Sequence, residues 1–218
     1  MAHALAEALR LDRLSPLREA VRALTRLADH QASESLFLTQ GKEILTQLIA
    51  QDHWLEEDFR KTHPDYYQQY LLYCDPHERF SLQSFVWGPG QSTPIHDHTV
   101  WGLVGVLQGA ESCVRYRQTA EGLISDGPAL VLERGSVDAV SPTVGDVHKV
   151  SNWFSDRTSI SIHIYGANIG NLRRHTFDAA TGAQKDFVSG YSHNRLPNLW
   201  DQAALIRAQG SQTLSAQS

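Results

Sequence analysis

The spacing of apolar residues divides the chain into a helical part and a β-rich part. Apolar positions recur every three or four residues over 17–27 and again over 42–50, and a shorter stretch of the same kind covers 54–59. From residue 80 onward, short apolar runs alternate with turns rich in Gly, Pro, Asp and Ser. This pattern predicts a mainly helical segment over residues 1–75, followed by a mainly β domain.

The β-rich part contains a series of short strand-like runs and no alternation of strands with long helices, which favours a sandwich or barrel. The predicted strands cover residues 80–87, 101–107, 112–118, 129–132, 147–150 and 159–165. We expect one domain overall, in which residues 1–75 pack on a barrel formed by 76–200. The last part of 76–200 is expected to close one end of the barrel, and the polar tail 201–218 to be partly disordered.

Composition narrows the classes of protein. The 218 residues are enough to bury a core, and the net charge of -5 argues against a domain whose main role is to bind nucleic acid. No apolar run approaches the ~18 residues that span a bilayer. The two cysteines, Cys74 and Cys113, cannot form a disulfide framework. We expect a cytoplasmic protein without membrane or nucleic-acid partners; its oligomeric state stays open.

Three histidines are placed to share one centre. His96 and His98 are two residues apart in an extended segment, so their side chains point the same way, while Asp97 points away. His148 opens another predicted strand. A lone histidine is more often a surface or hydrogen-bonded residue, but a pair with a distant third favours a facial metal site of neutral imidazoles.

A second polar pattern lies on the predicted strand 159–165. Its isoleucines alternate with Ser161, His163 and Tyr165, so one face is apolar and the other carries a hydroxyl, an imidazole and a phenol. A solvated edge strand would produce the same alternation. However, His and Tyr are readily buried when hydrogen-bonded, so we interpret the row as a relay that holds the phenol near a reactive ligand.

These motifs resemble those of the cupins, which implies a small jelly-roll barrel with an N-terminal helical segment. The matching residues are Gly90, His96, His98 and Gly109 in the first motif, and Gly145, His148 and Asn152 in the second. The first motif normally adds a glutamate ligand after three or four intervening residues beyond its second histidine, where this chain has Gly102 and Leu103. The resemblance therefore implies a centre of three histidines.

The three-histidine cupin with a Ser-His-Tyr row is similar to the thiol dioxygenases of the cysteine dioxygenase family, over residues 67–200. The resemblance implies that His96, His98 and His148 bind Fe(II). It also implies that Ser161, His163 and Tyr165 form the catalytic outer triad. The expected reaction adds O2 to the sulfur of a small thiol carboxylate and yields a sulfinate.

Departures from the mammalian type refine the expected substrate. In the mammalian type a cysteine shortly after the first two metal-binding histidines is crosslinked to the tyrosine. No cysteine closely follows His96 and His98 here, and Cys113 lies too far along the chain to match it, so Tyr165 is expected to carry no cysteine crosslink. Tyr67 and Gln69 stand where the mammalian type has Tyr-x-Arg. This pattern resembles the bacterial Gln-type branch, which includes 3-mercaptopropionate dioxygenases. A C-terminal arginine binds the substrate carboxylate there; the candidates are Arg173 and Arg174, of which we favour Arg174.

Two other functions fit the same residues. A three-histidine cupin could hold zinc or nickel and act as a hydrolase or isomerase. It could also be a non-catalytic cupin that binds a metal or a small ligand. The Ser161-His163-Tyr165 row argues against passive binding. The sequence leaves open whether 3-mercaptopropionate or L-cysteine is the substrate.

Overall fold

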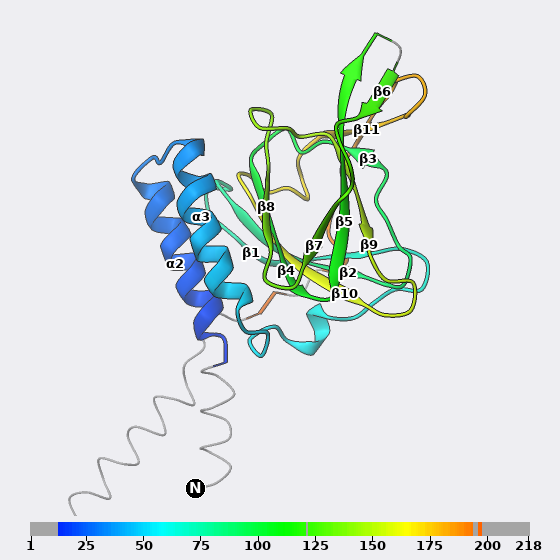
Figure 1. The fold of residues 1–218 in the computed structure, drawn as a ribbon. Helices are drawn as coiled ribbons and strands as arrows, with labels where there is room; N and C mark the ends of the chain where they lie inside the picture. Colours follow the sequence, from blue (N-terminus) through cyan, green and yellow to red (C-terminus); the bar gives the residue numbers. More distant parts are fainter. Residues whose placement is uncertain (1–12, 121, 194–195, 198–218) are drawn as a thin grey trace, which may run out of the picture.

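Two helices lie at one side of an antiparallel β structure, on the left in Figure 1. The computed structural model describes residues 13–120, 122–193 and 196–197. The helical elements are α2 (Ser15–Asp29), α3 (Glu34–Ile49) and the 3₁₀ turn η1 (Glu57–Phe59). The strands are β1 (Gln68–Cys74), β2 (Ser81–Trp87), β3 (Ile95–His96), β4 (Gly102–Gln108), β5 (Ala110–Thr119), β6 (Gly122–Ser125), β7 (Leu130–Glu133), β8 (Val137–Val140), β9 (His148–Asn152), β10 (Ser159–Tyr165), β11 (Arg174–Phe177) and β12 (Gln184–Phe187).

The strands form two sheets whose connections give the jelly roll. One sheet has the order β1-β2-β10-β4-β8, and the other has the order β12-β11-β3-β9-β5-β6, with β7 also paired to β5. Along the chain, β2 to β5 and β8 to β11 pass alternately from one sheet to the other. This alternation is the double-sheet arrangement of jelly rolls and cupins, and it confirms the predicted mainly β fold class.

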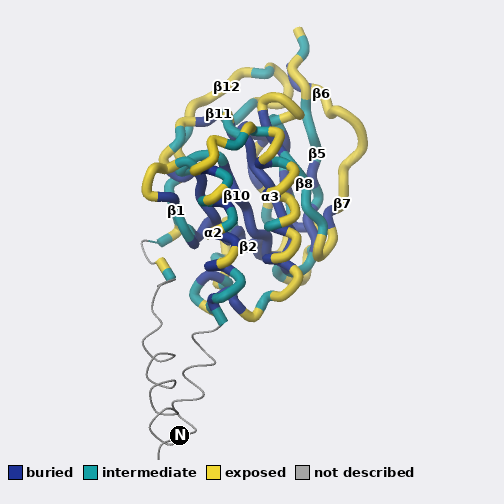
Figure 2. The backbone as a smooth tube through the Cα atoms, turned by 90° about the vertical axis from the view of Figure 1, so that its left-hand side faces the viewer, coloured by how far each residue is buried: buried dark blue, intermediate teal, exposed yellow. Residues whose placement is uncertain are grey.

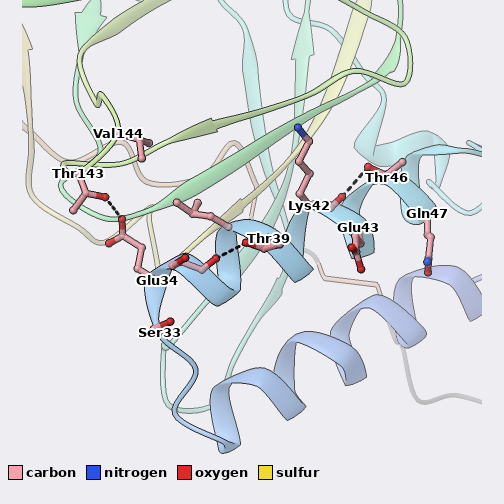
Figure 3. A pocket seen from close by; sticks show the side chains of 11 residues that line it. Ser33, Glu34, Thr39, Lys42, Glu43, Thr46, Gln47, Thr143 and Val144 are labelled. Atoms are coloured by element: carbon pink, nitrogen blue, oxygen red, sulfur yellow. Dashed lines mark hydrogen bonds between the residues drawn. The ribbon is translucent and has the colours of Figure 1, made fainter.

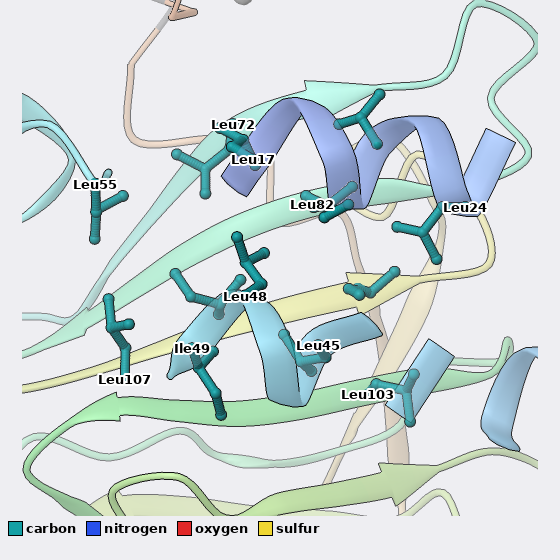
Figure 4. Close-up of a cluster of buried hydrophobic side chains, with 14 of the residues drawn as sticks. Leu17, Leu24, Leu45, Leu48, Ile49, Leu55, Leu72, Leu82, Leu103 and Leu107 are labelled. Atoms are coloured by element: carbon teal, nitrogen blue, oxygen red, sulfur yellow. The ribbon is translucent and has the colours of Figure 1, made fainter. Parts of the chain in front are cut away.

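Both helices bury one face against the sheet that contains β2, β4 and β10. Pro16 occupies the first turn of α2, and the Ser33 hydroxyl caps α3 by accepting the Leu36 backbone N–H. Helix α3 approaches the sheet closely, because a Cβ at Gly105 of β4 would lie 2.9 Å from Leu45 Cγ. In Figure 2, seen from the side of the helices, strands β2 and β10 are coloured as buried. Residues of the cluster between helices and sheet are labelled in Figure 4: Leu17, Leu24, Leu45, Leu48, Ile49, Leu55, Leu72, Leu82, Leu103 and Leu107.

Strand β10 has two buried faces. Ile160, Ile162 and Ile164 pack in the cluster between the helices and the sheet. The alternate residues Ser161 and His163 are 0% and 3% exposed on the other side. The polar face of β10 is therefore an interior face of the jelly roll, and the alternative of a solvated edge strand was wrong.

The six predicted strands are present, with ends that differ by about two residues at most. The helical prediction for 1–75 was wrong over β1, where Gln68–Cys74 pair with β2. Its tyrosines and leucines favour a strand packed against a neighbouring strand. The predicted helix at 54–59 is only the short η1 turn, and the helix predicted at 42–50 begins at Glu34.

The C-terminal part of the predicted barrel region contributes to the second sheet. Strand β11 pairs with β3, which sets Thr176 opposite His96, and β12 completes the hairpin. The expected disordered tail, 201–218, lies outside the described residues. No helix within the described part of the chain is both long and apolar enough to cross a membrane.

Candidate metal centre and its cavity

Three histidine side chains converge inside the jelly roll. His96 ends β3, His98 follows two residues later, and His148 opens β9 directly opposite His96. One ring nitrogen from each lies within 4.8 Å of the others, and all three residues are buried. The structure thus brings together the histidines that the sequence places at one centre.

Each of these histidines uses Nδ1 for another contact, so Nε2 remains for a ligand. His96 Nδ1 lies 3.1 Å from the Pro94 carbonyl oxygen, and His148 Nδ1 lies 3.4 Å from Cys113 Sγ. His98 Nδ1 lies 2.8 Å from Asp146 Oδ1. The Nε2 atom of His98 is buried and has no partner in the part of the chain that the structure describes. Contacts of this kind orient metal-binding imidazoles and fix their tautomers.

Asp146 is a functional residue that the sequence analysis missed. Its carboxylate accepts the backbone N–H groups of His98 and Thr99, at 3.0 Å and 2.8 Å, in addition to its contact with the His98 ring. Burial raises the pKa of Asp146, but these partners outweigh that effect and hold the pKa below its usual value. The sequence feature that could have identified Asp146 is its position two residues before His148, within the second cupin motif.

Two of the three histidines, His96 and His148, are neutral imidazoles at neutral pH. Burial, with help from the neighbouring His98, lowers the pKa of His96 to about 3. Burial also lowers the pKa of His148 well below its usual value, and both His96 and His98 add to this shift. Neutral imidazoles keep a free lone pair, so these residues are ready to bind a cation at pH 7.

The polar face of β10 forms a continuous hydrogen-bonded row. Ser161 Oγ lies 2.8 Å from His163 Nε2, and His163 Nδ1 lies 2.8 Å from Tyr165 Oη. The Trp87 indole N–H also donates to Ser161 Oγ, at 3.2 Å. The Tyr165 ring stacks on the His98 ring with centroids 5.2 Å apart, so the row ends beside the metal centre.

The tyrosine also explains why the glutamate of the usual cupin motif is missing. A Cβ at Gly102 would lie 2.6 Å from Tyr165 Cδ1, which is closer than real Cβ contacts. The phenol ring therefore covers the position from which a fourth protein ligand would extend. Gly102 of β4 and Tyr165 of β10 are paired in the sheet, so the two features depend on each other.

A cavity of about 370 Å³ opens beside the histidines. His96 and Tyr165 line it, together with Tyr67, Gln69 and Arg174. Gln69 Nε2 is a buried donor that finds no partner within residues 13–120, 122–193 and 196–197. Burial raises the pKa of Tyr67, and the charge of Arg174 acts in the opposite direction, so these two residues are neighbours in the cavity wall.

The two candidate arginines lie in different environments. Arg174 is 4% exposed; its terminal nitrogen donates to Ser189 Oγ at 2.7 Å, and its guanidinium stacks on Phe187. Its Nε has no partner among the residues that the structure describes. The Arg173 side chain is 72% exposed and forms an ion pair with Asp186. Arg173 does not line the cavity, because neighbouring residues of a strand point to opposite faces.

The strand that carries Arg174, β11, is hydrogen-bonded to the segment that carries His96 and His98. Asp97, between the two histidines, accepts the His175 backbone N–H at 2.7 Å and contacts His175 Nδ1 at 2.7 Å. The side chain that points away from the metal therefore holds the wall of the cavity in place.

Cys113 lies on β5 against His148, and the Tyr165 hydroxyl contacts His163. The absence of a cysteine crosslink on Tyr165 stays a prediction. A larger hollow of about 940 Å³ lies elsewhere, between α3 and the turn at Thr143 and Val144 (Figure 3). Two carboxylates, Glu34 and Glu43, line it, and Glu34 already accepts hydrogen bonds from Ser141 and Thr143.

Comparison with solved structures finds distant likenesses. One is a protein with a double-stranded β-helix domain from Klebsiella pneumoniae (TM-score 0.41, 16% identity, 52% of this chain and 89% of that chain). Another is a cupin superfamily protein from Desulfitobacterium hafniense (TM-score 0.39, 14% identity, 50% of this chain and 84% of that chain).

Comparison of sequences is more informative. The chain is 28% identical to cysteine dioxygenase type 1 of Danio rerio over 109 residues, which is 48% of this chain and 52% of that protein. The chain thus spans about half the length of this curated relative. The family model described as cysteine dioxygenase type I matches residues 63–178, more than half of the chain and the part that contains the histidines and the polar row. This chain belongs to the cysteine dioxygenase type I family.

Proposed function

We propose that this protein is an iron-dependent thiol dioxygenase that acts on a small thiol carboxylate, 3-mercaptopropionate or L-cysteine. The observation that carries the proposal is the shared cavity: neutral His96 faces the same space as the buried guanidinium of Arg174. Membership of the cysteine dioxygenase family supports thiol dioxygenation. Such a site suits a substrate with a metal-binding thiolate at one end and an anion at the other.

The residues of the centre fit a divalent metal ion. The histidines offer three nitrogen ligands within 4.8 Å of one another, and one of these atoms is buried without any partner. Imidazole ligands suit Fe, Zn, Cu and Ni, so iron is chosen through the family and not through the ligand set. When bound, Fe(II) would supply a Lewis-acidic and redox-active centre for the thiolate and O2.

Arg174 is the proposed anchor for the substrate carboxylate. Burial lowers the pKa of Arg174, which means that its charge is poorly solvated and that an anion would stabilise it. Within the described residues no carboxylate is paired with this guanidinium. The unpartnered amide of Gln69 is the second donor proposed for the substrate, and Tyr67 forms the wall between them.

Tyr165 is the proposed hydrogen-bonding group next to the reacting atoms. Burial raises its pKa, so the phenol stays protonated at neutral pH. His163 holds the phenol oxygen and Ser161 holds His163, so the hydroxyl is oriented before substrate binds. The overall reaction is balanced: both oxygen atoms join the sulfur, the thiol is oxidised by four electrons, O2 is reduced by four, and no other reductant is consumed.

The alternative functions have less support. Hydrolysis or isomerisation at a zinc or nickel centre requires neither the phenol nor an anchor for a thiol carboxylate. Passive binding of a metal or small ligand does not require the buried row Ser161-His163-Tyr165 that ends beside the three histidines.

Oxygen uptake by the iron-loaded protein tests the proposal with three thiols. We expect uptake with 3-mercaptopropionate or L-cysteine and a much lower kcat/KM with cysteamine, which lacks the carboxylate. Equal rates with cysteamine would contradict the role of Arg174. No uptake with any of the three would contradict thiol carboxylate dioxygenation.

A further inference from the structure

A buried carboxyl group lies behind the inner end of the polar row. Glu111 of β5 is 0% exposed, and among the described residues neither of its carboxylate oxygens has a partner within hydrogen-bond geometry. The polar groups that face it are the Ser161 hydroxyl and the Trp87 indole, both of which act to lower its pKa. A buried carboxyl without a firm partner is costly, so a structural or chemical role is needed to explain it.

The surroundings of Glu111 are mostly neutral. Its partners across the sheet are Asn152 on β9 and Leu132 on β7. The titratable groups that feel its charge are Cys113, two residues along β5, and Tyr165, at the far end of the row; the charge raises the pKa of each. His163 stands beyond Ser161 on β10. The Ser161 hydroxyl therefore links this carboxyl to the polar row, whose other end, Tyr165, lines the cavity.

We propose that Glu111 is a positioning residue that takes up and returns one proton through Ser161 and His163. Its charge state thereby sets whether the Tyr165 hydroxyl donates its hydrogen bond to His163 or into the cavity. Because Glu111 lies at the end of the row away from the metal centre, it would act on the substrate only through Tyr165.

Each charge state of Glu111 permits one direction of hydrogen bonding. An ionised Glu111 can only accept, so Ser161 donates to it, His163 Nε2–H donates to Ser161, and Tyr165 donates to His163 Nδ1. A neutral Glu111 can donate to Ser161; Ser161 then donates to His163 Nε2, and His163 Nδ1–H donates to Tyr165. In this second arrangement the phenol proton points into the cavity. The Trp87 N–H donates to Ser161 in both.

The two arrangements differ by one proton, and the row itself can carry it. A proton that arrives at the Tyr165 oxygen displaces the phenol proton to His163 Nδ1. His163 then passes its Nε2 proton to Ser161, and Ser161 passes its own to the Glu111 carboxylate. Each group gives one proton and receives one, so Glu111 alone changes charge. If the proposed function holds, the proton released when a thiol binds as a thiolate has an acceptor here.

The pKa values along the row favour Glu111 as the group that holds the added proton. Burial raises the pKa of Glu111 to about 7, whereas burial and His98 lower the pKa of His163 well below its usual value. Burial raises the pKa of Tyr165. At neutral pH neither His163 nor Tyr165 holds a net charge, so a proton added to the row rests on Glu111.

The test is the tautomer of His163, measured by ¹⁵N NMR on the full chain loaded with Zn(II), without thiol or O2. In the wild type we expect the His163 proton to move from Nδ1 at low pH to Nε2 at high pH, with a midpoint near pH 7. E111Q should abolish this switch, and S161A should abolish it as well. Glu133→Gln is the matched control, because Glu133 is exposed on the neighbouring β7 and should leave the switch unchanged.

A His163 tautomer that does not change with pH in the wild type would overturn the proposal. A wild-type switch that persists in E111Q, or in S161A, would also overturn it. Should E111Q fail to fold, the wild type and S161A still decide the question. The measurement needs no turnover, so a protein that shows the switch but consumes no oxygen would reject the proposed function and leave the role of Glu111 intact.

Discussion

Asp146 shows how much of the metal centre depends on a single residue that is not itself a ligand. Its carboxylate contacts the ring Nδ1 of His98 and accepts the backbone N–H groups of His98 and Thr99. Asp146→Asn should weaken metal binding by about 10–100-fold, because an amide cannot accept all of these hydrogen bonds. Competition with a chelator measures the affinity, and Asp126→Asn, at an exposed carboxylate, is the control. Equal affinity in both variants would contradict this role.

The adjacent arginines give a matched pair for the substrate anchor. Arg174→Gln should lower kcat/KM for a thiol carboxylate at least about tenfold, since a hydrogen bond to a charged group contributes about 1.5–3 kcal/mol. Arg173→Gln should change it by less than about twofold, because surface ion pairs such as Arg173–Asp186 contribute little. Steady-state oxygen uptake distinguishes the two. Similar losses in both variants would remove Arg174 from substrate binding.

At the scale of single residues, the sequence predicts a site residue where that residue belongs to a periodic pattern. The alternation in 159–165 places Ser161, His163 and Tyr165 on one face, and the spacing of His96 and His98 does the same. Glu111 and Asp146 were missed because each is a lone acidic residue whose role depends on strands that are distant in sequence. Alternation also separates Arg173 from Arg174, but only the packing of β11 shows which of the two faces the cavity.

Among the elements, the contact between β4 and β10 has the most direct effect on the site. In Gly102→Ala the new Cβ would lie 2.6 Å from the Tyr165 ring and 3.0 Å from Val140. Overpacking of this kind costs about 1–3 kcal/mol, and the phenol must move to relieve it. We expect near-normal metal affinity with a strongly reduced kcat.

Thermal unfolding, metal titration and oxygen uptake together check this variant. Gly127→Ala is the control for replacing a glycine, because a Cβ there would meet nothing within 4 Å. Gly127 has a φ of 98°, so this variant adds backbone strain but no overpacking. Wild-type kcat in Gly102→Ala would show that the ring position does not matter for turnover.

The predicted elements were most accurate where turn signals bound a strand. Strand β10 was predicted at its exact ends, because polar and Gly-containing segments flank it on both sides. Strand β1 was missed because its run of tyrosines and leucines has no clear period of two. Strand β3 has two residues, Ile95–His96, and its pairing with β9 and β11 is entirely a tertiary property.

For the whole molecule, the buried Glu111 carboxyl gives stability a defined pH dependence. Burial raises its pKa from 4.5 to about 7, so the folded state binds more protons than the unfolded state between these values. Its contribution to the free energy of unfolding therefore falls as pH rises through this window, by about 3 kcal/mol at most.

Comparison with Glu111→Gln isolates this effect from other titrating groups. The variant should gain stability relative to the wild type as pH rises from about 4.5 to 7, measured by urea unfolding at each pH. Glu133→Gln should show no such trend. A constant difference between the wild type and Glu111→Gln across this range would mean that Glu111 ionises normally in the folded protein.

The central claim is that both atoms of O2 are added to a thiol sulfur at the three-histidine centre. Turnover of the iron-loaded protein under ¹⁸O₂, with mass analysis of the sulfinate product, tests it most directly. We predict that both oxygen atoms of the sulfinate carry the label, and that His96→Ala forms no product. A product with one labelled oxygen, a disulfide as the main product, or equal product from His96→Ala would contradict the claim.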